Sequence, residues 1–168
     1  MQQPPLLPEE TFARVCRVAR FDGMSVLVLA GAVALVSATV GDVLGATVGL
    51  LAAGAGAIEL HGVTVLHHGE PRGMKWLVGS QFTLLAVILG YCALQLIRAK
   101  VPEVPPELEP MIQMNADLWE MSKHDFLLMM FNRVLYSALA FATVVYQSAM
   151  AFYYLRRRAA VVRALETE

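Results

Sequence analysis

Long apolar runs, separated by short polar segments, dominate the chain of 168 residues. A bilayer core of about 30 Å is crossed by about 20 helical residues, and four runs reach roughly that length. The pattern therefore predicts an all-α integral membrane protein whose single domain, residues 1–168, is a four-transmembrane-helix bundle. The predicted spans lie at about residues 22–40, 43–66, 75–97 and 132–156.

Two amphipathic segments accompany the spans. Residues 8–20 begin with Pro8, which is favoured in a first helical turn, and place apolar residues on one face and arginines elsewhere. Such a leader is typical of a helix on an anionic membrane surface, or of a simple basic anchor. In the outer loop, residues 98–131, apolar residues recur at helical spacing, which predicts an amphipathic helix on the outer leaflet or over the bundle. Ser122 with Asp125 three residues later predicts the N-cap of a helix that continues through the fourth span.

The Lys and Arg residues are concentrated on one side of the predicted bundle, although the formal net charge is only -1. They cluster before the first span, between the second and third spans, and after the fourth. The positive-inside rule therefore places both termini and the second connection in the cytoplasm, N-in and C-in. Basic side chains beside the spans are also expected to contact the anionic membrane surface. These are Arg14, Arg17, Arg20, Arg156, Arg157 and Arg158.

The first span has a second interpretation as a cleaved signal peptide. A basic leader and small residues near Ser37 fit that pattern. Its apolar run is longer than the hydrophobic region of a typical signal peptide, so we expect a retained span. The expected location is the bacterial inner (plasma) membrane, which the chain crosses several times.

One acidic residue, Glu59, lies inside the second predicted span. Ionisable residues within membranes are costly, usually face the bundle interior and are functional-site candidates. On a helix, Glu59 continues a row of small residues formed by Gly49, Ala52, Gly56 and Gly62. Small residues at this spacing allow a second helix to approach closely. We therefore expect Glu59 to face a packed helix interface rather than lipid.

Further polar residues align with Glu59 in the other predicted spans. Gln81 in the third span and Gln147 in the fourth lie, like Glu59, within roughly 12 Å of the cytoplasmic end at about 1.5 Å per residue. Polar side chains aligned in this way either hydrogen-bond across a bundle or line a wet path. The candidate transport or pore residues are Glu59, Gln81, Tyr91, Gln95, Thr143 and Gln147.

Two functions fit this polar set. In the first, the protein is an oligomeric membrane channel or a small transport protein for ions, protons or solutes. A low dielectric favours the neutral form of a carboxyl group, which makes proton coupling reasonable. In the second, it is a non-catalytic structural or accessory membrane protein whose polar residues hold helix packing. Four short spans enclose little volume in one protomer, so we expect a homo-oligomer in the lipid bilayer.

Other chemistry has weaker support in the sequence. His61, His67 and His68 are candidate metal ligands near the cytoplasmic interface, although a metal-free histidine cluster is the favoured interpretation. Cys16 and Cys92 are expected to be small packing residues. The sequence contains no hydrolase, metalloprotease or phosphate-loop motif, so we expect no catalytic residue, no cofactor and no enzyme activity. The arginine run after the fourth span fits a membrane anchor, and we expect no nucleic-acid partner.

Overall fold

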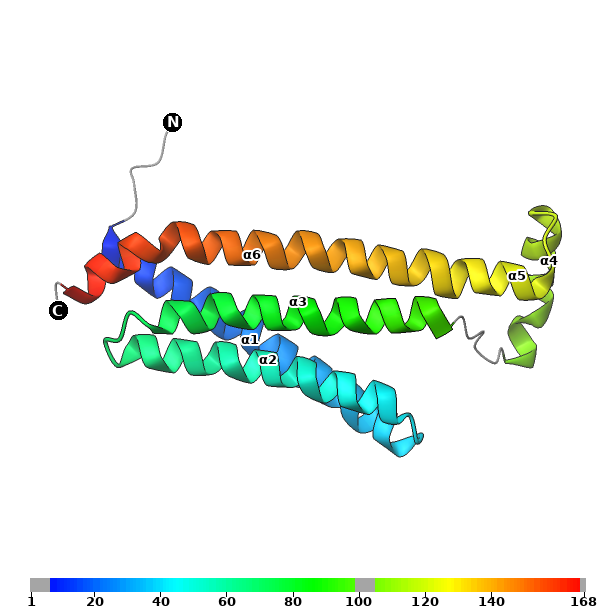
Figure 1. Cartoon of the computed structure of the whole chain (residues 1–168), viewed down its shortest axis with the longest axis horizontal. Helices are drawn as coiled ribbons and strands as arrows, with labels where there is room; N and C mark the ends of the chain where they lie inside the picture. Colours follow the sequence, from blue (N-terminus) through cyan, green and yellow to red (C-terminus); the bar gives the residue numbers. More distant parts are fainter. Residues whose placement is uncertain (1–6, 99–104, 167–168) are drawn as a thin grey trace. The chain divides into compact units, whose positions relative to one another are not determined.

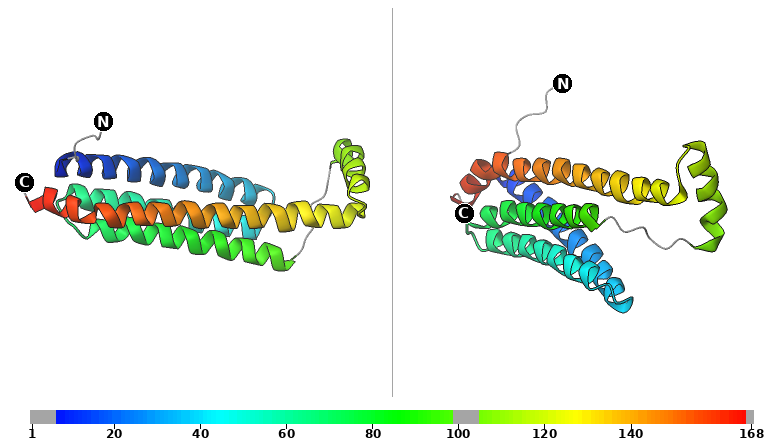
Figure 2. Two further views of the ribbon diagram at one scale, coloured as in Figure 1. Left: turned by 90° about the horizontal axis from the view of Figure 1, so that it is seen from above. Right: turned by 45° about the vertical axis from the view of Figure 1, so that its right-hand side comes forward.

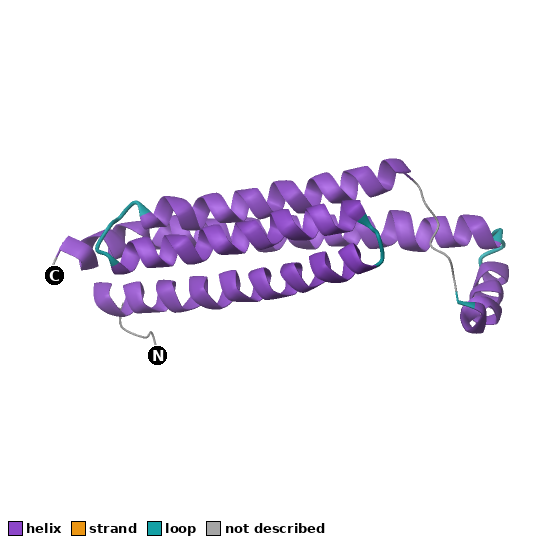
Figure 3. Ribbon diagram, turned by 90° about the horizontal axis from the view of Figure 1, so that it is seen from below, coloured by secondary structure: helices purple, strands orange, loops and turns teal. Residues whose placement is uncertain are grey.

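The computed structural model describes residues 7–98 and 105–166, and every element in this part of the chain is a helix (Figures 1 and 3). Four helical stretches are long and apolar enough to cross a membrane. The predictions of an all-α class and of four such helices are therefore confirmed. Residues 99–104 of the predicted outer loop lie outside the described residues. The elements are α1 (Pro8–Thr39), α2 (Val43–His67), α3 (Gly73–Arg98), η1 (Pro106–Leu108), α4 (Glu109–Leu118), α5 (Lys123–Leu127), η2 (Leu128–Val134) and α6 (Leu135–Glu166).

The chain folds into two compact units. The first contains α1, α2, α3 as far as Ile88 and α6 from Val145 onwards, and these helices run side by side as a bundle (Figure 2). Within this unit, the amino end of α1, the α2–α3 connection and the carboxyl end of α6 lie at the same end (Figure 1). The second unit contains residues 89–144.

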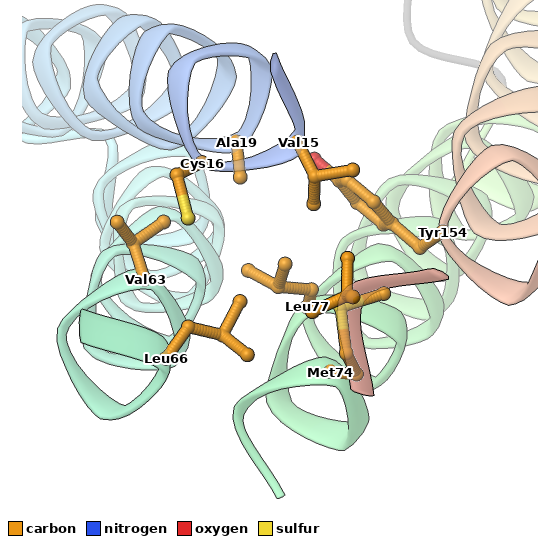
Figure 4. Close-up of a cluster of buried hydrophobic side chains, with 9 residues drawn as sticks. Val15, Cys16, Ala19, Val63, Leu66, Met74, Leu77 and Tyr154 are labelled. Atoms are coloured by element: carbon orange, nitrogen blue, oxygen red, sulfur yellow. The ribbon is translucent and has the colours of Figure 1, made fainter. Parts of the chain in front are cut away.

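The predicted leader and the predicted first span form one continuous helix, α1. Pro8 begins this helix, as the sequence predicts. Val15, Cys16 and Ala19 are buried against side chains of α2, α3 and α6, towards which they point (Figure 4). The predicted leader at residues 8–20 is thus continuous with the first span, and neighbouring helices cover its apolar face.

Glycines bring α1 and α2 into close contact. Their connection turns at Gly41, whose φ of 75° lies in the left-handed region that favours glycine. Asp42 then caps α2, because its carboxylate accepts a hydrogen bond of 3.0 Å from the Gly45 amide. A Cβ added to Gly56 would lie 2.7 Å from the Gly23 carbonyl oxygen, so the two backbones touch at this level. The predicted row of small residues is buried, and so is Glu59, which continues it. The small residues are Gly49, Ala52, Gly56 and Gly62.

The second unit contains a helix in the outer loop, where the sequence predicts one. This helix, α4, buries Ile112 and Ala116. The predicted N-cap is also present, since the Ser122 hydroxyl accepts a hydrogen bond of 3.1 Å from the Asp125 amide. From Lys123 onwards the chain is helical without a break through α5, the π-helical turn η2 and α6.

Candidate functional site

Two acidic side chains are buried inside the first unit, Asp22 on α1 and Glu59 on α2. Asp22 is 6% exposed and Glu59 is 2% exposed. The close approach of the two helices brings them together: a Cβ added to Gly23 would lie 3.3 Å from the Glu59 Cβ. Asp22 follows Ala19 by three residues and Val15 by seven, so it continues the buried face of α1.

Two tyrosines of α6 donate hydrogen bonds to these carboxyl groups. The Tyr154 hydroxyl lies 2.6 Å from the Glu59 Oε1 atom, and the Tyr146 hydroxyl lies 2.7 Å from the Asp22 Oδ1 atom. Tyr154 is completely buried, and its ring belongs to an apolar cluster with side chains of α1, α2 and α3 (Figure 4). Hydroxyl donors to a carboxyl group form short, strong hydrogen bonds, so α6 fixes the positions of both acids.

A buried glutamine, Gln81, completes the polar group, which we call the acidic cluster: Asp22, Glu59, Gln81, Tyr146 and Tyr154. The Gln81 Nε2 atom donates to the Asp22 Oδ2 atom at 3.3 Å, and the Gln81 side chain also lies within interaction range of the Glu59 carboxyl group. The Oε1 atoms of Gln81 and Gln147 are buried and accept no hydrogen bond from the described residues. A buried acceptor without a donor is costly, and a protonated carboxyl group is a suitable donor.

Charge balance is the distinctive property of the acidic cluster. Among the described residues, the buried polar side chains include two acids but no Lys, Arg or His. Transferring an unpaired carboxylate into a low-dielectric interior is very unfavourable, and two neighbouring carboxylates also repel each other. A bound proton or another small cation would balance the charge of the pair.

The six predicted transport residues divide between the two units. Glu59, Gln81 and Gln147 belong to the first unit, and Tyr91, Gln95 and Thr143 belong to the second. Of the three residues that are predicted to share one layer, the structure brings Glu59 and Gln81 together in the acidic cluster. Gln147 is buried on α6, and its Oε1 atom accepts no hydrogen bond from the described residues.

The second unit has its own polar group, the neutral cluster, formed by Tyr91, Gln95, Asn132 and Tyr136. The Gln95 Nε2 atom donates to the Tyr91 hydroxyl at 2.9 Å, and the Asn132 side chain donates to the Gln95 carbonyl oxygen at 2.9 Å. The rings of Tyr91 and Tyr136 pack edge to face with their centroids 5.8 Å apart. Thr143 is buried, at 7% exposure. No ionisable acid or base belongs to the neutral cluster apart from the two phenols.

The candidate metal ligands His61, His67 and His68 are not brought together. The Nδ1–H groups of His67 and His68 donate to carbonyl oxygens one helical turn back, at 2.9 Å and 2.7 Å. His61 is exposed and packs edge to face against the Trp76 ring, with centroids 5.4 Å apart. In residues 7–98 and 105–166, no group of three or more His, Cys, Asp or Glu side chains could hold a metal ion.

Sequence reasoning missed Asp22 and Tyr146. Asp22 stands directly after a series of arginines at the start of the first span, where an acid resembles an ordinary interfacial charge. Its helical phase gave the better signal, because it continues the face of Val15 and Ala19. Tyr146 is half exposed, and no pattern in the sequence links it to α1.

The fold and the acidic cluster define a class of protein. Four helices able to cross a membrane, with carboxyl groups buried between them, characterise a polytopic membrane protein with an intramembrane polar site. No protein-family model, curated protein or solved structure matches the chain.

Proposed function

We propose that the protein is a small membrane transport protein in which the acidic cluster binds and releases a proton. The observation that supports this function is the pair of buried carboxyl groups, which have no buried basic partner among the described residues. Acidic residues within membrane bundles commonly form proton relays in pumps and transporters. The proton binds at this pair, because its positive charge offsets the negative charge of the two carboxyl groups.

The side chains of the acidic cluster have distinct roles in this proposal. The proton is shared by Asp22 and Glu59. Tyr154 and Tyr146 hold the two carboxyl groups with hydrogen bonds of 2.6 Å and 2.7 Å, so that neither rotates away from the other. The Gln81 Nε2 atom donates to the Asp22 Oδ2 atom at 3.3 Å and links a third helix, α3, to the pair.

The proposed protein has both termini in the cytoplasm of a bacterial cell and forms a homo-oligomer in the inner membrane. The amino end of α1, the α2–α3 connection and the carboxyl end of α6 share one end of the first unit (Figure 1), and the basic residues of the chain are most numerous there. Oligomers supply the interfaces that a small bundle lacks for a transport path.

Proton flux into proteoliposomes tests the proposed function. The protein is reconstituted with a pH-sensitive dye inside the vesicles, and an imposed pH gradient drives the flux. We expect flux with the natural protein and markedly lower flux with Glu59→Gln, since glutamine keeps the shape of the side chain but binds no proton. Parallel vesicles with an imposed sodium gradient test whether the transported species is a proton or another small cation.

Asp42→Asn is the matched control for this experiment. Asp42 is exposed on the connection between α1 and α2, and asparagine caps a helix as well as aspartate does. This variant removes one carboxyl group outside the acidic cluster and should keep the natural flux. Equal fluxes for the natural protein and Glu59→Gln would contradict the proposed role of Glu59.

A structural role is the second candidate function, and one observation favours it. The hydrogen bonds of Tyr154 and Tyr146 link α6 to both α2 and α1, so the acidic cluster joins three helices. Under this alternative, the natural protein conducts no protons. Glu59→Gln then lowers the melting temperature or leaves it unchanged, and vesicle permeability stays at background.

A further inference from the structure

An open groove lies between α3 and α6 in the first unit. Its volume is about 240 Å³, and apolar side chains of both helices line most of it. Val78 and Phe82 contribute from α3, and Leu155 contributes from α6. The groove is smaller than the roughly 300–1,000 Å³ that encloses a whole small molecule, so it fits one extended part of a larger ligand.

Two basic side chains stand at one end of this groove, Lys75 on α3 and Arg158 on α6. Both are exposed, and neither forms an ion pair with a described residue. Two unpaired positive charges on neighbouring helices repel each other, and an anion bound by both relieves that repulsion. Their position therefore favours a bound anion that contacts both.

The order of residues along the groove matches the order of groups in a phospholipid. The helices are antiparallel, so Lys75 and Arg158 lie at the same end. Phe82 lies seven residues further along α3, about 10 Å deeper at about 1.5 Å per residue. The positive charges thus meet an anion at the membrane surface, and the apolar groove continues towards the bilayer core.

We propose that this groove binds an anionic phospholipid, with the phosphate group on Lys75 and Arg158 and one acyl chain along Val78, Phe82 and Leu155. Basic pockets between transmembrane helices bind anionic head groups, and acyl chains favour apolar surfaces within the bilayer. The inference is independent of the proposed proton transport, since it depends on other residues. Tyr154, which donates to Glu59, also lines the groove.

Lipid binding to the purified protein in detergent tests the proposal. The probe is phosphatidylglycerol, compared with phosphatidylcholine and with inorganic phosphate at the same concentrations, and binding is measured by native mass spectrometry and by the shift of the melting temperature. We expect binding of phosphatidylglycerol alone. Lys75→Gln with Arg158→Gln should weaken it roughly 25-fold, about fivefold for each basic side chain.

Arg156→Gln with Arg157→Gln is the control for total charge, because it removes two neighbouring charges that do not line this groove. We expect this variant to bind phosphatidylglycerol like the natural protein. Equal weakening by both double variants would show a diffuse electrostatic attraction and overturn the proposal. Equal binding of inorganic phosphate would show that the site binds free anions rather than a phospholipid. That result would also overturn the proposal.

Gly79→Leu tests the acyl-chain part while both charges stay in place. Gly79 lines the groove, and a Cβ added there meets no atom within 4 Å, so a larger side chain enters the groove without a clash. We expect weaker binding of phosphatidylglycerol. Gly54→Leu is the matched control, because Gly54 also has open space around it but lies on α2. Unchanged lipid affinity in Gly79→Leu would contradict the groove as the acyl-chain site.

Discussion

The acidic cluster and the neutral cluster contain side chains of similar size, yet they differ in how their polar groups are satisfied. In the neutral cluster, Gln95 donates to Tyr91 and Asn132 donates to the Gln95 backbone. These bonds involve no charge and need nothing from outside the protein. In the acidic cluster, two carboxyl groups are buried without a basic partner among the described residues.

The difference shows that polarity alone does not identify a functional site in a membrane bundle. An amide or phenol satisfied by another side chain contributes modestly to helix packing. Under the proposed function, the buried carboxyl pair binds a proton or cation whose concentration changes across a membrane, so the charge state of the acidic cluster follows external conditions. The neutral cluster contains no carboxyl group that could respond in this way.

The largest expected effect comes from removing both acids. We expect Asp22→Asn with Glu59→Gln to lower proton flux to the level of protein-free vesicles, because no carboxyl group is left to carry the proton. The measurement is the proteoliposome assay with a pH-sensitive dye. The comparison variant, Gln95→Leu with Asn132→Leu, changes two residues of the neutral cluster and should keep the natural flux. Loss of flux in both variants, with both correctly folded by circular dichroism, would remove the distinction between the clusters.

The next largest effect concerns the helix contact that holds the two acids together. A Cβ added to Gly56 would lie 2.7 Å from the Gly23 carbonyl oxygen and 2.8 Å from the Leu27 amide nitrogen, so Gly56→Ala forces the helices apart. We expect a loss of about 1–3 kcal/mol in the free energy of unfolding, as for other overpacked sites. Titration with a denaturing detergent measures it.

Gly54→Ala is the control for the glycine contact. A Cβ at Gly54 meets no atom within 4 Å, and alanine is the better helix former by about 0.5–1 kcal/mol. We therefore expect unchanged or slightly higher stability. Equal destabilisation by Gly54→Ala and Gly56→Ala would mean that the helix contact does not limit the space at Gly56.

The fold could be predicted from the sequence because bilayer thickness sets a simple requirement on the length of each apolar run. Ser122 and the small residues beside Glu59 were also interpretable, since a helix cap and a close helix contact depend on local spacing. Depth within the spans separated Gln81 from Gln95, because only Gln81 was expected in the layer of Glu59. The hydrogen bond from Gln81 to Asp22 was not predictable, since it joins side chains on two different helices.

Asp22 illustrates a different limit of sequence interpretation. Arg14, Arg17 and Arg20 precede it along the chain, and they suggest an interfacial position. Its neighbours in space are Gln81 and Tyr146, which come from α3 and α6. A contact between residues 124 positions apart leaves no mark on local periodicity. Helical phase could only indicate that Asp22 faces inwards.

A smaller effect is expected from the hydroxyl group that holds Glu59. Tyr154→Phe removes the donor of the 2.6 Å hydrogen bond and should lower the free energy of unfolding by about 1 kcal/mol. Tyr153→Phe is the matched control, since the buried Tyr153 hydroxyl has no hydrogen-bond partner among the described residues and its loss should not destabilise the protein. Detergent-induced unfolding of the two variants measures the difference, and equal stabilities would contradict a structural role for the Tyr154 bond.

The smallest effect is expected in the neutral cluster. Tyr91→Phe removes the oxygen that accepts the 2.9 Å hydrogen bond from Gln95, but the ring keeps its edge-to-face contact with Tyr136. Hydrogen bonds between side chains in membrane proteins contribute about 0.6 kcal/mol on average, so we expect a loss of that size in detergent-induced unfolding. Proton flux should not change, because no proton-binding carboxyl group has lost a partner. A loss of flux in Tyr91→Phe as large as that in Glu59→Gln would mean that both clusters lie on one transport path. The charge of the acidic cluster would then not distinguish a functional site from a packing contact.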